Sequence, residues 1–464
     1  MAKFKALPIA AAVATVLVAM SASAVEFHGY MRAGIGQNAD GGGQVCYGNG
    51  GAYAHAVGRL GDECDMYAEL TLGQEVFNRD GKTFGVVSTI AYGTHESGPG
   101  EGGVPQMGSQ GNSWQAQGGE SSSPWEGGRL SVREMYATAK GIIGDSTFWA
   151  GKRFGQRKDI HILDFFYLMN SGTGVGFDGL SAGPGKLSFQ WNQANTGDGG
   201  PAFPDFDWSN APGQNHPDMD QDVVNGGTNT WHRTNKLDVR YNLPVGSQNI
   251  DFVAIYGAPT LTDLQKDNGA FDEAGYLAQV EWTMPILGGF NKLSGTYATN
   301  GFADLRDAFW GLNYATWLGE GEGYGVINHG LVKFGKKVEM AYVLKYTNTD
   351  LDSNGWAESE SYSAVARPMF KWNDVMSTAL EVGYDNVDWN GTAICDGNLC
   401  GDRHQAREGG EDLFKVTLAQ QWSPLQNGGF WARPQFRLFV SNYSGDRAVK
   451  EAETMFGAQV EAWW

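Results

Sequence analysis

Short segments with apolar residues on one face and charged residues on the other recur along almost the whole chain. The clearest are residues 66–73 (MYAELTLG), 237–241 (LDVRY), 276–284 (YLAQVEWTM) and 414–421 (FKVTLAQQ). Side chains that alternate with a period of two lie on opposite faces of a β-strand. No segment after residue 24 shows a convincing helical period, and 67 glycines suit a structure rich in turns. The sequence therefore predicts an all-β protein.

The alternation alone leaves open which face is inside. A soluble barrel buries its apolar face, whereas a membrane barrel turns that face to lipid and encloses a polar interior. Aromatic residues at strand ends favour the membrane arrangement, because they form girdles at the bilayer interfaces. The final segment, 455–464 (MFGAQVEAWW), also reads as a strand that ends on an aromatic residue, with Phe456, Ala458, Val460, Ala462 and Trp464 facing outward. The strand-end tryptophans are Trp282, Trp372, Trp422 and Trp431. We predict a single transmembrane antiparallel β-barrel.

The first 24 residues have the pattern of a secretory signal peptide. Lys3 and Lys5 precede an apolar stretch from Ala6 to Met20, and Ala22-Ser23-Ala24 matches a cleavage site. Residues 25–464 are then the mature barrel, and no linker divides them. No later stretch reaches about 20 uninterrupted apolar residues, so we expect no transmembrane helix.

The net charge and the cysteines limit which partners and cofactors we expect the chain to bind. Removal of Lys3 and Lys5 leaves 31 basic and 52 acidic residues, a net charge of −21, which argues against binding to nucleic acid. Four cysteines in an exported chain predict two loop disulfides, Cys46–Cys64 and Cys395–Cys400. A metal site is the alternative, but no pair of histidines accompanies either couple. We expect no metal and no cofactor.

The loops alternate in length. The long polar segments 96–128 and 195–229 are expected to face outward, and short turns such as 243–246 (LPVG) to face the periplasm. One further segment, 151–176, concentrates charges of both signs beside the aromatic residues Phe165, Phe166 and Tyr167. Such a mixture suits a sugar, whose hydroxyls need polar partners and whose C–H faces stack on rings. Within a channel it predicts an inward-folded constriction loop; the alternative is an ordinary surface loop with aromatic anchors.

Several blocks of sequence, in order, resemble the maltoporin family along essentially the whole mature chain. They are VEFHGYMRAGIG (25–36), RLGDECDMYAELTLGQEVF (59–77), FWAGKRFGQRKDIHILDFF (148–166), GFNK (289–292), RPMFKWNDVMSTALEVGYDNV (367–387), LFKVTLAQQW (413–422) and FGAQVEAWW (456–464). The resemblance implies a barrel of about 18 strands in the outer membrane of a Gram-negative cell. It further implies a homotrimer that passes maltose and malto-oligosaccharides, contacts outer-membrane lipid and offers its long loops to bacteriophage.

The family carries sugar along a slide of channel aromatics flanked by charged residues. The matching aromatics are Tyr30, Tyr67, Phe166, Phe290 and Trp463, with Tyr362, Trp114 and Trp125 as weaker candidates. The matching polar residues are Arg32, Arg59, Glu69, Arg133, Arg157, Asp159 and Asp164. Strand parity independently places Tyr67 with Glu69 and Trp463 opposite Trp464. The chain departs from the family at Phe166, which replaces a tyrosine, at Leu168, which replaces an aromatic residue, and at Ser361, which aligns with a slide tryptophan.

Three other functions are compatible with parts of the sequence. A porin for another saccharide such as sucrose, or a less selective general porin, is the main alternative because of the changes at the constriction. A glycosidase would need paired carboxylates, but Asp159 and Asp164 lie in a cation-rich loop that favours both being ionised. The sequence contains neither G-x-S-x-G nor H-E-x-x-H, so we do not expect an enzyme. An adhesive barrel would not need an interior lined by aromatic and charged residues.

Overall fold

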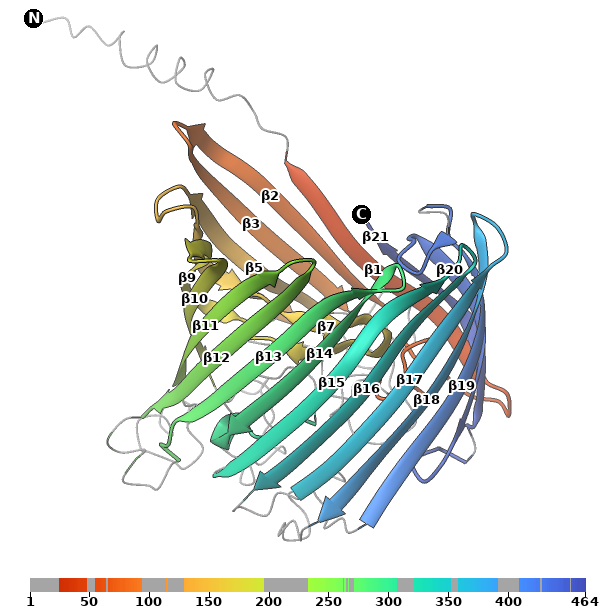
Figure 1. Ribbon diagram of the computed structural model, residues 1–464. Coiled ribbons are helices and arrows are strands. Elements are labelled where there is room, and N and C mark those ends of the chain that lie inside the picture. The colour runs from red at the N-terminus through yellow and green to blue at the C-terminus, as the bar shows by residue number, and fades with distance from the viewer. Residues whose placement is uncertain are drawn as a thin grey trace, which may run out of the picture.

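A computed structural model describes most of the chain after the first 24 residues. The described residues are 25–47, 55–63, 66–93, 114–115, 129–195, 233–261, 263, 266, 271–306, 320–351, 358–390, 409–425, 428–450 and 452–464. Eighteen long antiparallel strands form one closed barrel, because each strand pairs with the next and β1 also pairs with β21. Closure satisfies every strand edge within the wall, as a bilayer without water requires. Figure 1 shows the tilted strands of this wall.

The wall consists of β1 (Glu26–Asn38), β2 (Tyr67–Arg79), β3 (Lys82–Gly93), β5 (Arg129–Lys140), β6 (Thr147–Arg153), β9 (Gly172–Ala182), β10 (Gly185–Asn195), β11 (Arg233–Val245), β12 (Gln248–Thr260), β13 (Gly275–Ile286), β14 (Gly289–Thr299), β15 (Gly321–Phe334), β16 (Val338–Leu351), β17 (Glu358–Lys371), β18 (Met376–Asn390), β19 (Gly409–Trp422), β20 (Gln435–Ser444) and β21 (Thr454–Trp463). Shorter elements are β4 (Trp114–Gln115), β7 (Lys158–Ile160), β8 (Phe165–Leu168) and the 3-10 helices η1 (His161–Leu163) and η3 (Asn300–Phe302).

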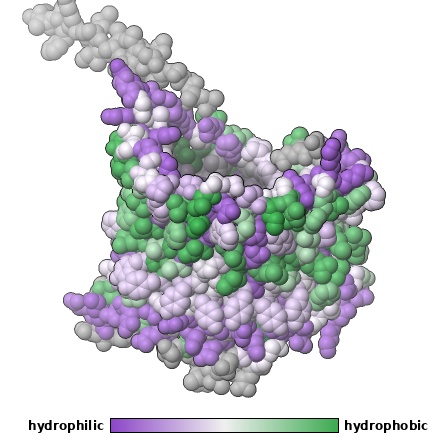
Figure 2. All heavy atoms as spheres, viewed as in Figure 1, coloured by the Kyte–Doolittle hydropathy of each residue, from purple (hydrophilic) through white to green (hydrophobic). Residues whose placement is uncertain are grey.

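The barrel is apolar outside and charged inside, as the alternation predicted for a membrane protein. On β19, for example, Leu418 is 50% exposed, whereas Lys415 on the opposite face is fully buried. On β16 and β20, likewise, buried residues alternate with more exposed ones along the strand. Figure 2 shows the resulting hydrophobic band across the viewed wall, with hydrophilic rims above and below it. None of the described helices has the length and apolar character needed to cross a bilayer.

A belt of tyrosines runs along the outer face of seven consecutive strands, β12 to β18. Its rings are in contact where their strands place them close together, as at Tyr256 and Tyr276, whose centroids lie 5.3 Å apart. The members are Tyr256, Tyr276, Tyr297, Tyr324, Tyr346, Tyr362 and Tyr384. Such amphipathic rings belong at the boundary between lipid and water. At the opposite end of the wall, Trp282 and Trp372 are also exposed on the outside, as expected for the second girdle.

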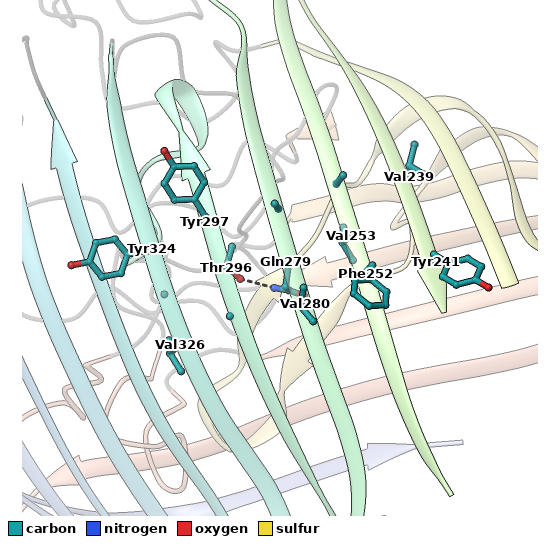
Figure 3. A pocket seen from close by; sticks show the side chains of 14 residues that line it. Val239, Tyr241, Phe252, Val253, Gln279, Val280, Thr296, Tyr297, Tyr324 and Val326 are labelled. Atoms are coloured by element: carbon teal, nitrogen blue, oxygen red, sulfur yellow. Dashed lines mark hydrogen bonds between the residues drawn. The ribbon is translucent and has the colours of Figure 1, made fainter. Parts of the chain in front are cut away.

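An outer-wall groove lies within this lipid-facing surface. It has a volume of about 580 Å³, crosses β11 to β15 and lies outside the channel. Gly295 and Gly325 supply no side chains there, so the rings of Tyr241, Tyr297 and Tyr324 border a hollow (Figure 3).

The connections alternate as predicted. The turn between β11 and β12 spans only two residues beyond Val245, and short turns likewise join β2 to β3 and β13 to β14. The segments 96–128 and 195–229 lie mostly outside the described residues. Cys46 is disulfide-bonded. Cys64, Cys395 and Cys400 lie outside the described residues, so both disulfide pairings stay predictions.

Candidate functional site

The constriction loop leaves the wall after β6 and carries β7, η1 and β8 into the channel (Figure 1). Its three consecutive aromatic residues, 165–167, alternate between two faces. Tyr167 is fully buried and its hydroxyl donates to Glu281 on the inner face of β13. Phe165 is also fully buried, with the Lys345 ammonium of β16 4.7 Å from its ring centre. Phe166, between them, is only partly buried. The two flanking rings therefore anchor the loop to the wall, while Phe166 packs against the Phe154 and Met169 cluster.

A second inward segment, residues 55–63 of the first outer loop, packs against the constriction loop. The backbone N–H of Arg59 donates to the Ile162 carbonyl at 2.9 Å. Gly58 sits at φ +100°, a left-handed conformation, and a Cβ there would lie 2.3 Å from the Glu381 carboxylate. On the wall, Gly383 provides a matching recess, because its Cβ would lie 2.0 Å from the Val57 carbonyl oxygen. Two glycines thus let this segment lie flat on the inner wall and bring the Arg59 guanidinium to the Tyr30 hydroxyl.

Three of the expected slide aromatics form a row across three neighbouring strands. Tyr30 on β1 is the direct pairing partner of Trp463 on β21. On its other side, Tyr30 lies 6.1 Å from Tyr67 of β2, measured between ring centroids. Trp463 and Trp464 face opposite sides of the wall, and Trp464 packs outside against Phe27 at 5.8 Å. The structure therefore brings Trp463, Tyr30 and Tyr67 together on the inner face.

Charged groups flank this row. The Arg59 guanidinium donates to the Tyr30 hydroxyl at 2.9 Å, and that hydroxyl donates to Glu461 at 3.1 Å. Arg32 reaches Asp164 at 2.8 Å and lies 5.4 Å from the Tyr67 ring centre. Opposite charges in direct contact are what allows so many ionised groups to be buried together. The row therefore has fixed hydrogen-bond donors and acceptors beside its rings.

The other predicted residues extend the site toward the far side of the constriction. The Tyr67 hydroxyl donates to Glu69 at 2.5 Å. Arg157 lies 4.1 Å from the Phe154 ring centre and 4.9 Å from that of Phe166. Arg133 approaches the same Phe154 ring at 5.2 Å. Phe290 lies farther along the wall on β14, 6.2 Å from the His329 ring.

Two buried groups of the constriction loop, Asp164 and His161, differ in charge because their surroundings shift their pKa values. Burial opposes ionisation of Asp164, but Arg59 and Arg32 outweigh it and hold the pKa of this carboxyl well below its ordinary value. Burial and the neighbouring Arg59 and Arg433 hold the pKa of His161 well below its ordinary value, although Glu461 opposes them. Asp164 is thus an anion and His161 a neutral ring that accepts from Arg433 Nη2 at 3.0 Å.

Asp159 differs from Asp164. Loss of hydration raises the pKa of the Asp159 carboxyl, an effect that the Arg157 cation partly offsets and the Asp164 anion reinforces. As the pH falls from about 7 to about 4, toward the ~3.9 of an ordinary aspartate, Asp159 is expected to take up a proton before Asp164. The cation selectivity of the channel should fall in this first step. Reversal potentials in a salt gradient measure it: Asp159→Asn should remove the step, and Asp164→Asn should retain it. Persistence of the step in Asp159→Asn would contradict this assignment.

Two sequence-based assignments are wrong. Tyr362 is 47% exposed on the outer face of β17 and belongs to the tyrosine belt, 6.2 Å from Tyr384, so it cannot line its own channel. Ser361, its neighbour, has the inner facing but no ring. Trp431 was assigned to the outer girdle, yet its ring lies 5.2 Å from that of His161, inside the barrel. Trp431 lies within a turn before β20, where side chains do not alternate between two faces as they do in a strand. Trp125 and the side chain of Trp114 lie outside the described residues.

No cluster of three or more histidine, cysteine, aspartate or glutamate side chains suited to a metal ion occurs among the described residues. Of the two predicted carboxylates in the constriction loop, Asp164 is paired to Arg32.

Comparison with known proteins identifies the sequence family. The LamB porin family matches residues 25–464. A curated maltoporin from Hahella chejuensis is 36% identical over 472 aligned positions, which cover 99% of this chain and 98% of that protein. Among solved structures, OccD3 of Pseudomonas aeruginosa is 11% identical, with 96% of this chain and 92% of that chain covered and a TM-score of 0.45. OmpF of Salmonella typhi, in complex with daunomycin, is 9% identical, with 95% and 97% covered and a TM-score of 0.45. The family assignment rests on the two sequence matches.

Proposed function

The chain belongs to the LamB porin family of outer-membrane sugar porins, and we propose that it carries maltose and maltodextrins by facilitated diffusion along its channel aromatics. The observation that supports this most is the row of Trp463, Tyr30 and Tyr67 on adjacent strands. The sequence relative at 36% identity is itself a maltoporin. The family match begins at residue 25, which supports cleavage of the signal peptide after Ala24.

Transport of this kind needs weak, repeated binding and no chemical step. A glucose ring that stacks on one aromatic side chain gains about 1 kcal/mol, which thermal motion overcomes readily. Because the next ring in the row lies only 6.1 Å away, at Tyr67 beside Tyr30, a sugar chain can move along the wall while part of it stays bound. Arg32, Arg59 and Asp164 offer hydroxyl partners along the same path, which offsets the loss of hydration.

A porin for another saccharide is the competing function, because Phe166 lacks the hydroxyl that the family places at the constriction. Liposome swelling separates the two. Maltose and sucrose have the same mass, so a channel that selects by size alone admits both at equal rates. We expect faster swelling in maltose than in sucrose. Equal rates, or faster swelling in sucrose, would contradict transport selective for maltodextrins.

The assembly is proposed to be a homotrimer, as in the family that the sequence resembles. The tyrosine belt supports an uneven environment around the wall, since its seven members lie on the consecutive strands β12 to β18. The outer faces of β1 and β2 instead expose aliphatic and phenylalanine side chains, including Phe27, Ile35, Leu70 and Leu72. An apolar face without the belt suits contact with a second copy of the chain. The mass of the particle in mild detergent measures the assembly, and a monomer would contradict it.

A further inference from the structure

The connection between β19 and β20 turns inward at the end of the barrel where the short turns lie. Its residues 428–434 contact three separate parts of the inner surface. The Phe430 N–H donates to Glu339 of β16 at 2.7 Å, and Arg433 Nη2 donates to Glu461 of β21 at 2.7 Å. The Trp431 ring meets His161 of the constriction loop. This segment, which we call the exit turn, therefore narrows the periplasmic mouth.

The exit turn is held rigidly. Arg433 Nη1 donates to the carbonyls of Phe430 and Ala432 at 3.1 and 2.9 Å, so one guanidinium fixes the turn backbone and the Glu461 carboxylate together. Phe430 is only 5% exposed and meets the Trp431 ring edge-on, with centroids 4.8 Å apart. Trp431, in contrast, is 39% exposed. The turn thus buries one ring as a support and presents the next ring to the channel.

The Trp431 ring is placed relative to the Trp463 ring much as Tyr30 is placed relative to Tyr67. Its centroid lies 6.5 Å from that of Trp463, with an interplanar angle of 48°. The corresponding values for Tyr30 and Tyr67 are 6.1 Å and 53°. The Arg433 guanidinium lies 4.2 Å from the Trp463 ring centre, so a cation stands beside this pair as Arg32 stands beside Tyr67.

We propose that Trp431 forms an additional sugar-stacking subsite at the periplasmic exit, which lengthens the aromatic row to Trp431, Trp463, Tyr30 and Tyr67. This inference rests on the proposed sugar transport. A long malto-oligosaccharide can stack on all four rings, whereas a trisaccharide can occupy the three wall rings without Trp431. The exit turn then sets how strongly the channel prefers long chains and how fast sugar leaves into the periplasm.

The test compares block of ion current by maltohexaose and by maltotriose in purified Trp431 variants. Loss of one stacking contact should weaken maltohexaose binding about three- to tenfold and maltotriose binding less. Trp431→Leu keeps an apolar contact for His161 but has no flat face, so it should behave like Trp431→Ala. Trp431→Phe should restore binding to within about twofold. Trp372→Ala, which removes an exposed tryptophan from the outer side of the same barrel end, should change neither sugar.

The variants also separate this inference from the function on which it rests. Unchanged maltohexaose binding in both Trp431→Ala and Trp431→Leu, with weakened binding in Trp463→Ala, would overturn the exit subsite and leave the row intact. Equal losses in the leucine and phenylalanine variants would also overturn it, because the flat ring would then be irrelevant. Unchanged binding in Trp463→Ala as well would overturn the row itself. Open-channel conductance close to that of the parent protein confirms that each variant is folded.

Discussion

Trp463→Ala is expected to weaken maltodextrin binding about tenfold, a loss of about 1.4 kcal/mol, while ion conductance stays the same or rises. Trp463 lies between Trp431 and Tyr30, so its removal breaks the row and also deprives the Arg433 guanidinium of the ring 4.2 Å away. The smaller side chain widens the passage for ions but leaves a gap that a sliding sugar must cross. Titration of single-channel current with maltotriose measures both effects.

The control for this prediction lies on the same strand. Phe456 of β21 is 44% exposed on the outer face, so Phe456→Ala removes a large ring from the lipid side and none from the channel. Sugar affinity should be unchanged in this variant. An affinity in Trp463→Ala equal to that in Phe456→Ala would contradict a role for the row in binding.

Glu461→Gln is expected to destabilise the barrel by about 3–5 kcal/mol, because it leaves buried cations without their counter-charge. The Glu461 carboxylate forms three ion pairs, with Arg433 at 2.7 Å, Arg437 at 3.0 Å and Arg59 at 3.1 Å. Its side chain is 1% exposed, so water cannot replace the lost charge. The thermal unfolding temperature should fall, and the channel should shift toward anions because three guanidinium groups lose a shared carboxylate.

Glu26→Gln is the matched control, because Glu26 is exposed at the start of β1. A neutralised surface carboxylate should change stability by less than about 1 kcal/mol. The two variants have the same charge, so a difference between them reports burial alone. Similar unfolding temperatures and similar reversal potentials in both variants would contradict the part assigned to Glu461.

The strand period was enough to predict which wall residues share a face, and the signal peptide with the strand-end aromatics then predicted that the apolar face meets lipid. A shift of one residue in the strand register would move every side chain to the other side of the wall. The facing of each residue is therefore strongly determined wherever a strand is regular. Tyr67 and Glu69, for example, share the inner face, and Trp463 and Trp464 face opposite ways. The burial pattern of β20, which alternates at every position, shows how regular the signal is.

The remaining errors arose where that period is absent. Trp431 lies within a turn, whose inward position depends on bonds to Glu339 and Glu461, two residues distant in sequence. Tyr362 is a different case, because the family alignment and not strand parity suggested it, and the alternation of β17 turns it to the outer face. The inward path of residues 55–63 depends on Gly58 and Gly383, which come together only when the barrel closes. Pairings between distant loops and strands leave no short-range pattern in a sequence.

Single-channel recording in a planar bilayer, with titration by maltotriose and separately by sucrose, tests the central claim most directly. A maltodextrin channel assembled as a trimer predicts that maltotriose blocks the current of one inserted particle in three equal steps, and at lower concentrations than sucrose does. Block by sucrose at equal or lower concentrations would contradict selectivity for maltodextrins. An absence of block by either sugar would contradict the sugar-binding row.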